Sequence, residues 1–172
     1  MFRESINSFE TFLKTHDRVV MYSVLSRHDI KVPDIRLIVG YVGNSNLNID
    51  IKYPAGIFSP LREVGIDGVV TSLEGLKSIL EYRAFMRNPH TITSILFRWP
   101  GSVEKCLVID DYVSLRKYED LALKICEVLN CKVCEIYFTH DEYVIDVNPV
   151  PELSGKNLIE KYVRLVKKVI KK

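Results

Sequence analysis

The chain has 172 residues, of which 47% are hydrophobic and 27% charged, and its formal net charge is +2. Such a chain can form one globular unit or two small lobes with a sizeable core, and the small net charge argues against nucleic-acid binding, which needs a clustered basic patch. Because no signal-peptide pattern opens the chain and no apolar run is long enough to cross a bilayer, we expect a cytoplasmic protein with no membrane partner.

The first half of the chain predicts a helix, three strands and a second helix. The first helix covers residues 8–29 and ends ahead of Pro33, because the residue before a proline avoids the helical region. Its apolar pattern starts at Phe9, Phe12 and Leu13. Ser72 is predicted to cap the second helix. The predicted segments are strand 36–42, turn 43–46, strand 47–53, loop 54–68, strand 69–72 and helix 73–86.

The second half predicts strands, a helix, a hairpin and a terminal helix. The hairpin joins two strands between Cys134 and Asn148 through a polar turn at residues 139–143. The other predicted segments are strands 93–99 and 105–115, helix 116–130 and amphipathic helix 156–171, whose inward residues are Leu158, Ile159, Tyr162, Leu165, Val166, Val169 and Ile170. The order predicts an α+β chain with two mostly antiparallel sheets and flanking helices, divided into lobes 1–92 and 93–172 with a cleft between them.

The four cysteines lie at positions 106, 126, 131 and 134. Cys131 and Cys134 form a C-x-x-C pair, but no second pair and no nearby histidine pair completes a zinc set. We therefore interpret all four as buried apolar cysteines and expect no zinc.

The hairpin carries a candidate magnesium site. Asp146 and Asn148 are two apart in a strand and share one face, and Glu135 on the partner strand can approach them. Carboxylate and amide oxygens are the ligands that Mg²⁺ prefers, and Mg²⁺ usually accompanies phosphates. We expect Asp146 to face solvent. The alternative is a solvated sheet edge in which Asn148 is only a turn residue before Pro149.

A second candidate feature is Lys52, which precedes a glycine-bearing loop. A lysine at a strand end can contact a phosphate as a point charge, and loop glycines can bring backbone N–H groups close to an anion. The loop matches neither a P-loop nor a Rossmann pattern. The alternative is that Lys52 is a solvated edge residue.

Taken in order, these segments resemble the ATP-grasp superfamily, and within it the RimK-like amino-acid ligases in a minimal form. The resemblance covers almost the whole chain. It rests on five segments, of which the last is the most specific: HDRVVMYSVLSRHDIKVPDIRLIV from His16, IDIKYP from Ile49, GVVTSLEGLKSIL from Gly68, CEIYF from Cys134 and VIDVNPVPELSG from Val144.

The resemblance implies that the chain binds ATP and Mg²⁺. Glu135, Asp146 and Asn148 would hold the metal, and adenine would lie near residues 97–99. The implied nucleotide contacts are Arg18, Lys52, Gly65, Gly68, Phe97, Arg98, Trp99 and Lys105.

The function that the resemblance implies is an ATP-dependent carboxylate–amine ligase acting through an acyl phosphate. One alternative is a non-catalytic relative that binds nucleotide as a subunit or regulator, because only sixteen residues precede Asp17 and an arginine-bearing segment is missing after Val113. Another is a small-molecule kinase, because some kinases of the superfamily share the Asp-x-Asn ending. A homodimer or a partner chain would supply the acceptor domain for a small molecule or peptide. The lack of glutamine, with many Lys, Glu, Val and Ile, is compatible with a thermophilic source.

Overall fold

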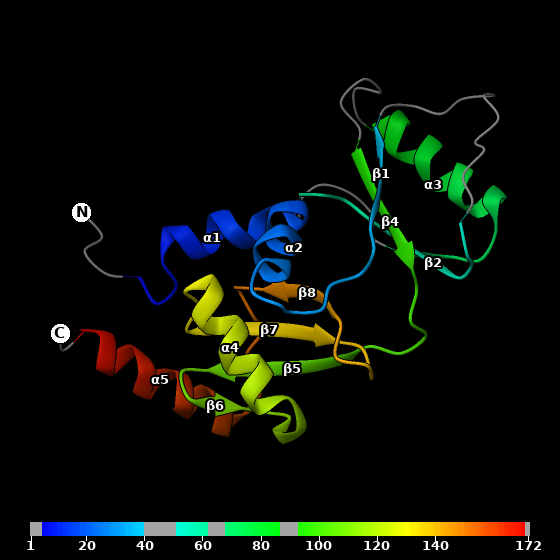
Figure 1. Ribbon diagram of the computed structural model, residues 1–172. Coiled ribbons are helices and arrows are strands. Elements are labelled where there is room, and N and C mark those ends of the chain that lie inside the picture. Colours follow the sequence, from blue (N-terminus) through cyan, green and yellow to red (C-terminus); the bar gives the residue numbers. More distant parts are fainter. Residues whose placement is uncertain (1–4, 40–50, 62–67, 87–92, 171–172) are drawn as a thin grey trace. The chain divides into compact units, whose positions relative to one another are not determined.

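The structure is a computed structural model that describes residues 5–39, 51–61, 68–86 and 93–170. The chain divides into two compact units. Unit 1 comprises Met1–Val32 and Ser102–Lys172, and unit 2 comprises Pro33–Gly101. Each unit holds one sheet, as Figure 1 shows.

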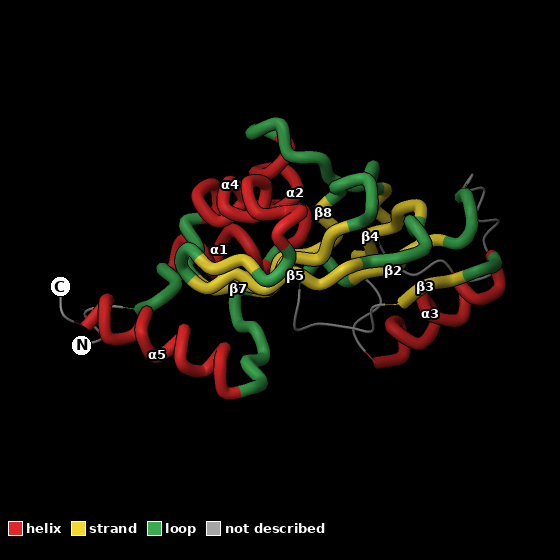
Figure 2. The backbone as a smooth tube through the Cα atoms, turned by 90° about the horizontal axis from the view of Figure 1, so that it is seen from below, coloured by secondary structure: helices red, strands yellow, loops and turns green. Residues whose placement is uncertain are grey.

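Unit 1 is an antiparallel four-stranded sheet with helices on both faces. The strand order is β6-β5-β7-β8. Helices α1, α2 and α4 lie on one side of strands β5 and β7, and α5 lies on the other (Figure 2). The elements are α1 (Phe9–His16), α2 (Arg18–Ser26), β5 (Glu104–Ile109), β6 (Tyr112–Val113), a 3₁₀ turn (Arg116–Tyr118), α4 (Glu119–Leu129), β7 (Val133–Phe138), β8 (Val144–Asn148) and α5 (Lys156–Ile170).

Unit 2 is a second antiparallel four-stranded sheet, with strand order β1-β4-β2-β3, and helix α3 packs on one face. As predicted, Ser72 caps α3 by accepting a hydrogen bond from the Gly75 N–H at 3.1 Å. Its core joins Ile38, Ile57 and Leu96 of the sheet to Leu76 and Leu80 of α3. The elements are β1 (Arg36–Val39), β2 (Ala55–Phe58), β3 (Gly68–Val70), α3 (Leu73–Met86) and β4 (Thr93–Arg98).

The predicted fold class is confirmed: the chain is α+β, with two antiparallel sheets and flanking helices. The two compact units differ from the predicted lobes, whose boundary was at residue 92. The N-terminal helices belong to unit 1, and β4 pairs with β1 and β2 of unit 2. Residues 93–98 and residues 104–113 therefore belong to separate sheets.

The single helix predicted at residues 8–29 is two helices. Asp17 adopts an extended conformation (φ −96°, ψ 115°) and caps α2 by accepting hydrogen bonds from the N–H groups of Val19 and Val20. An aspartate side chain competes in this way with the helix backbone. The apolar residues Phe9, Phe12 and Leu13 are exposed, whereas Thr11 and Thr15 are buried.

Three other predicted segments need correction. The predicted loop 54–68 contains strand β2. Within this strand, Gly56 lies against the Phe97 ring, and an added Cβ would be 2.6 Å from the nearest ring carbon. The predicted strand 105–115 is the β5–β6 hairpin, which turns at Asp110 with φ 56°. Residues 47–50 of the predicted strand 47–53 lie outside the described residues, and residues 51–53 are not in a strand.

The terminal helix α5 covers one face of the unit 1 sheet with a narrow stripe. Leu165 is buried against Leu107, Ile109 and Val133. Leu158, Tyr162 and Val169 complete the stripe, while Ile159 and Ile170, which were predicted to face inward, are exposed. Residues 158, 162, 165 and 169 follow the spacing of one helix face, and positions 159 and 170 lie off it. Within the described residues, none of the helices is both long enough and apolar enough to span a bilayer.

Candidate functional site

The β7–β8 hairpin places two acids and an amide on one face of the unit 1 sheet. Glu135 pairs directly with Asn148, and Tyr137 pairs with Asp146. Residues that alternate along a strand share a face, and directly opposed residues have Cβ atoms about 4.5–5.5 Å apart. The register of the hairpin therefore places Glu135, Asp146 and Asn148 on one face of the sheet, as predicted.

Glu135 is buried, with 5% of its side chain exposed, and each carboxylate oxygen has a hydrogen-bond donor. The Lys105 ammonium lies 3.0 Å from Oε1, and the Tyr137 hydroxyl donates to Oε2 at 3.1 Å. Lys105 is paired with Tyr137 across β5 and β7, so all three side chains lie on the same face. Lys105 therefore lies beside this group of side chains, and its own side chain is 54% exposed.

Asp146 is held by Arg18, the first residue of α2. Arg18 donates from Nε to Oδ1 at 3.3 Å and from a terminal nitrogen to Oδ2 at 3.0 Å, and the Val147 N–H also donates to Oδ1. Both side chains are buried, with 4% and 12% exposed. The expectation that Asp146 faces solvent is wrong, because α2 packs its guanidinium onto the carboxylate.

Asn148 closes a small turn at the end of β8. Its Oδ1 accepts from the Val150 N–H at 3.1 Å, and its Nδ2 donates to the Val150 carbonyl at 3.0 Å. Asn148 therefore fixes the turn that follows β8. The same hydrogen bonds fix which end of its amide carries the oxygen.

The chemistry of this donor set fits a magnesium ion. A carboxylate has about four acceptor positions, and an amide oxygen has two. Each Glu135 oxygen and the Asn148 amide oxygen accepts one hydrogen bond, so each keeps a further acceptor position within the described part of the chain. Two carboxylates and an amide oxygen are hard ligands of the kind that Mg²⁺ takes, and Arg18 and Lys105 bring positive charge that suits a phosphate.

The predicted nucleotide contacts of unit 2 lie on different faces. Phe97 and Trp99 have ring centroids 6.1 Å apart and form an aromatic cluster with Phe58. Arg98 is exposed and, by strand alternation, points to the opposite face. Lys52 is exposed and outside a strand, Gly68 begins β3, and Gly65 lies outside the described residues.

One contributor to these sites, Tyr137, was missed in the sequence, and the packing role of a second, the loop glycine Gly56, was not predicted. Tyr137 donates to Glu135, and its position two residues along the same strand was the available signal. Gly56 allows the Phe97 ring to approach the sheet, but a glycine inside a proline-flanked segment predicts a loop as readily as a strand.

No protein-family model matches the chain, and no curated protein matches it in sequence. Solved structures do resemble it. A RimK-domain ATP-grasp protein from Sphaerobacter thermophilus aligns with a TM-score of 0.69 and 21% identity over 94% of this chain and 69% of that one. A D-alanine–D-alanine ligase from Bacillus anthracis gives 0.72 and 14% identity, over 97% and 69%. The same enzyme complexed with ATP gives 0.70 and 15% identity, over 96% and 68%.

This likeness shows the fold. The chain has an ATP-grasp-like fold, as the order of its sequence motifs predicted.

Proposed function

We propose that the chain is an ATP- and Mg²⁺-dependent carboxylate–amine ligase of the ATP-grasp type. The observation that carries the proposal is the placement of Glu135, Asp146 and Asn148 on one face of the β7–β8 hairpin, with Lys105 and Arg18 bonded to the two carboxylates. The fold is that of structures that include ligases, and one of these was solved with ATP.

In the proposed reaction, a substrate carboxylate attacks the terminal phosphorus of ATP, ADP leaves, and an amine then displaces phosphate from the acyl phosphate. Bound Mg²⁺, held by Glu135, Asp146 and Asn148, would offset negative charge on the phosphoryl group. Lys105 can turn from Glu135 to a phosphate oxygen, because its side chain is half exposed. Arg18 is fixed by its buried pairing and would keep the Asp146 carboxylate oriented.

The remaining nucleotide contacts are proposed for unit 2. Phe97 and Trp99 belong to an aromatic cluster in which Phe97 is buried and Trp99 is half-buried, so Trp99 would supply the ring surface for a purine; Lys52 is a solvent-exposed cation. Gly65, Gly68 and Arg98 complete the proposed set. Stacking on an aromatic ring and hydrogen bonds to the backbone would hold adenine without side-chain hydrogen bonds to the base.

Hydroxylamine trapping tests the reaction, because hydroxylamine converts an acyl phosphate into a stable hydroxamate. The protein is incubated with ATP, Mg²⁺, hydroxylamine and a panel of amino acids and dicarboxylic acids. The proposal predicts ADP and hydroxamate in equal amounts with at least one acid, and loss of both without Mg²⁺. ADP formation with a phosphorylated hydroxyl product would instead identify a kinase and contradict the ligase.

A non-catalytic nucleotide-binding role is the second candidate. It is favoured by the Arg18–Asp146 pair, because a buried guanidinium balances this carboxylate without a metal ion. ATP binding that does not need Mg²⁺, with no ADP release across the same panel, would support this role.

A further inference from the structure

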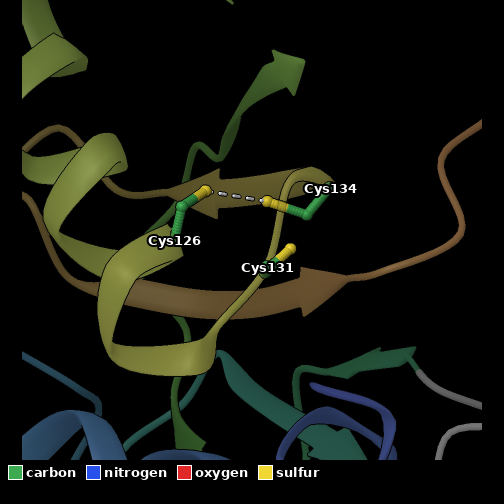
Figure 3. Close-up of side chains that lie close together, drawn as sticks. All are labelled: Cys126, Cys131 and Cys134. Atoms are coloured by element: carbon green, nitrogen blue, oxygen red, sulfur yellow. Dashed lines mark hydrogen bonds between the residues drawn. The ribbon is translucent and has the colours of Figure 1, made fainter. Parts of the chain in front are cut away.

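Three cysteine side chains meet at the end of α4 and the start of β7, outside the face that carries Glu135. Cys126 comes from α4, Cys134 from β7, and Cys131 from the turn between them (Figure 3). Their sulfur atoms all lie within 4.8 Å of one another, and the Cys126 and Cys134 sulfurs are 3.5 Å apart. All three residues are buried.

The local backbone explains why the sulfurs converge. Helix α4 ends at Asn130, which adopts the left-handed conformation with φ 54°, and the Cys131 N–H donates to the Cys126 carbonyl at 2.8 Å. This helix cap turns the chain directly into β7, so one short segment supplies all three thiols. Cys131 and Cys134 stood out as a pair in the sequence, but the contribution of Cys126 depends on this turn.

The spacing of the sulfurs matches that of ligands around one metal ion. With metal–sulfur bonds of about 2.3 Å, the sulfur atoms of a tetrahedral site lie roughly 3.8 Å apart. The distances in the cluster reach this value after movements of less than about 1 Å, which side-chain rotation provides. No fourth His, Cys, Asp or Glu of the described chain joins the group at this distance.

We propose that Cys126, Cys131 and Cys134 form a three-thiolate site for a single thiophilic metal ion, either Zn²⁺ or Cu(I). Soft thiolate ligands select these ions. The site is separate from the proposed magnesium site and does not depend on the proposed function. The proposal replaces the interpretation of these three cysteines as apolar core residues, because their buried thiols lie next to one another.

Metal binding by thiols requires that they lose their protons, because the thiolate is the ligand. A metal ion bound by this cluster would therefore replace thiol protons and release them to solvent.

A disulfide between Cys126 and Cys134 is the competing chemistry. It would require an oxidant and a contraction of the 3.5 Å separation to the length of a sulfur–sulfur bond, about 2.05 Å, and it would leave Cys131 without a role. Metal binding uses all three thiols and needs no oxidant.

Metal titration of the reduced chain tests the proposal. Under anaerobic conditions, Zn²⁺ and Cu(I) are added in separate experiments against a chromophoric chelator for each ion. We expect one equivalent of at least one ion to be retained. Absorption spectroscopy at the metal edge of that complex should give three sulfur neighbours at about 2.3 Å. This readout uses the unmodified protein and does not depend on whether a variant folds.

Matched substitutions locate the site. Cys131→Ala should weaken metal binding at least tenfold, whereas Cys106→Ala should bind like the unmodified chain, because Cys106 is equally buried but lies outside the trio. The proposal is overturned if the reduced chain retains neither ion, if fewer than three sulfurs surround the metal, or if the two variants bind equally well.

Discussion

At the scale of single residues, the Arg18–Asp146 pair couples the first turn of α2 to strand β8. The guanidinium contacts both carboxylate oxygens, and both side chains are buried. A buried charge without its partner is costly, so each residue depends on the other for stability as well as for any role in ligand binding.

This dependence predicts the outcome of a double-mutant cycle. Arg18→Met should lower the free energy of unfolding by about 3–5 kcal/mol, because Asp146 would remain buried without its partner. Asp146→Asn added to that variant should cost less than it does alone, with a coupling of about 0.5–3 kcal/mol. Urea denaturation of the four proteins measures the coupling, and additive effects would contradict it.

Residue identities predicted part of this chemistry. The co-facial placement of Asp146 and Asn148 follows from strand alternation, and Glu135 follows from pairing in a short hairpin. The buried state of Asp146 could not be predicted, because Arg18 lies 128 positions away and its direction depends on the break at Asp17. Long-range side-chain partners are set by tertiary packing, which a local pattern does not contain.

At the scale of elements, Gly56 lets strand β2 accept the ring of Phe97 from β4. An added Cβ would meet three ring carbons at 2.6–3.0 Å, and the ring is confined by Phe58 at a centroid distance of 5.1 Å. The proposed aromatic surface for a purine therefore depends on a residue that has no side chain.

The Gly56→Ala variant should destabilise the protein by about 1–3 kcal/mol, the usual cost of overpacking. Gly75→Ala is the matched control. There the new Cβ would lie 3.5 Å from the nearest atom, in ordinary contact within α3, and alanine favours a helix over glycine. Thermal unfolding of both variants checks the prediction, and equal stabilities would contradict it.

A second element-scale contact joins β5 to the turn before α4. Glu104 accepts hydrogen bonds from Lys117 and from the Tyr118 hydroxyl, and Lys117 is the larger cause of the lowered pKa of Glu104. A carboxylate whose pKa is lowered by folding stabilises the protein above its unfolded pKa and loses this contribution as the pH falls.

The stability advantage of the unmodified chain over Glu104→Gln should therefore be full near neutral pH. It should shrink as the pH falls from the ordinary range of a glutamate, near 4.5, through the lowered pKa of the folded state. The advantage should be small, because the pair is on the surface. Melting temperatures of both proteins from pH 3 to pH 7 measure it, and an advantage that grows on acidification would contradict this assignment.

At the scale of the whole molecule, the sequence predicts the element types better than their assembly. Helix 73–86 with its Ser72 cap and the β7–β8 hairpin have strong local signals and are present. The placement of β4 in the sheet of unit 2 has no strong local signal, because Thr93–Arg98 pairs with a strand that begins as far back as Arg36. Which sheet a strand joins depends on contacts distant in sequence, which local patterns do not contain.

The function proposed for the molecule depends on Glu135 binding the magnesium ion of ATP. The chain contains a matched control, because Glu104 also accepts hydrogen bonds from a lysine and a tyrosine but lies on the opposite face of the same sheet. Replacement of either glutamate by glutamine removes one charge and keeps the shape.

Calorimetric titration of ATP, with and without Mg²⁺, into the unmodified chain, Glu135→Gln and Glu104→Gln tests this dependence most directly. We predict that Mg²⁺ tightens ATP binding to the unmodified chain and to Glu104→Gln, and that Glu135→Gln weakens Mg²⁺-dependent binding at least tenfold, or about 1.4 kcal/mol. Equal affinities for the two variants, or binding to the unmodified chain that ignores Mg²⁺, would contradict the account.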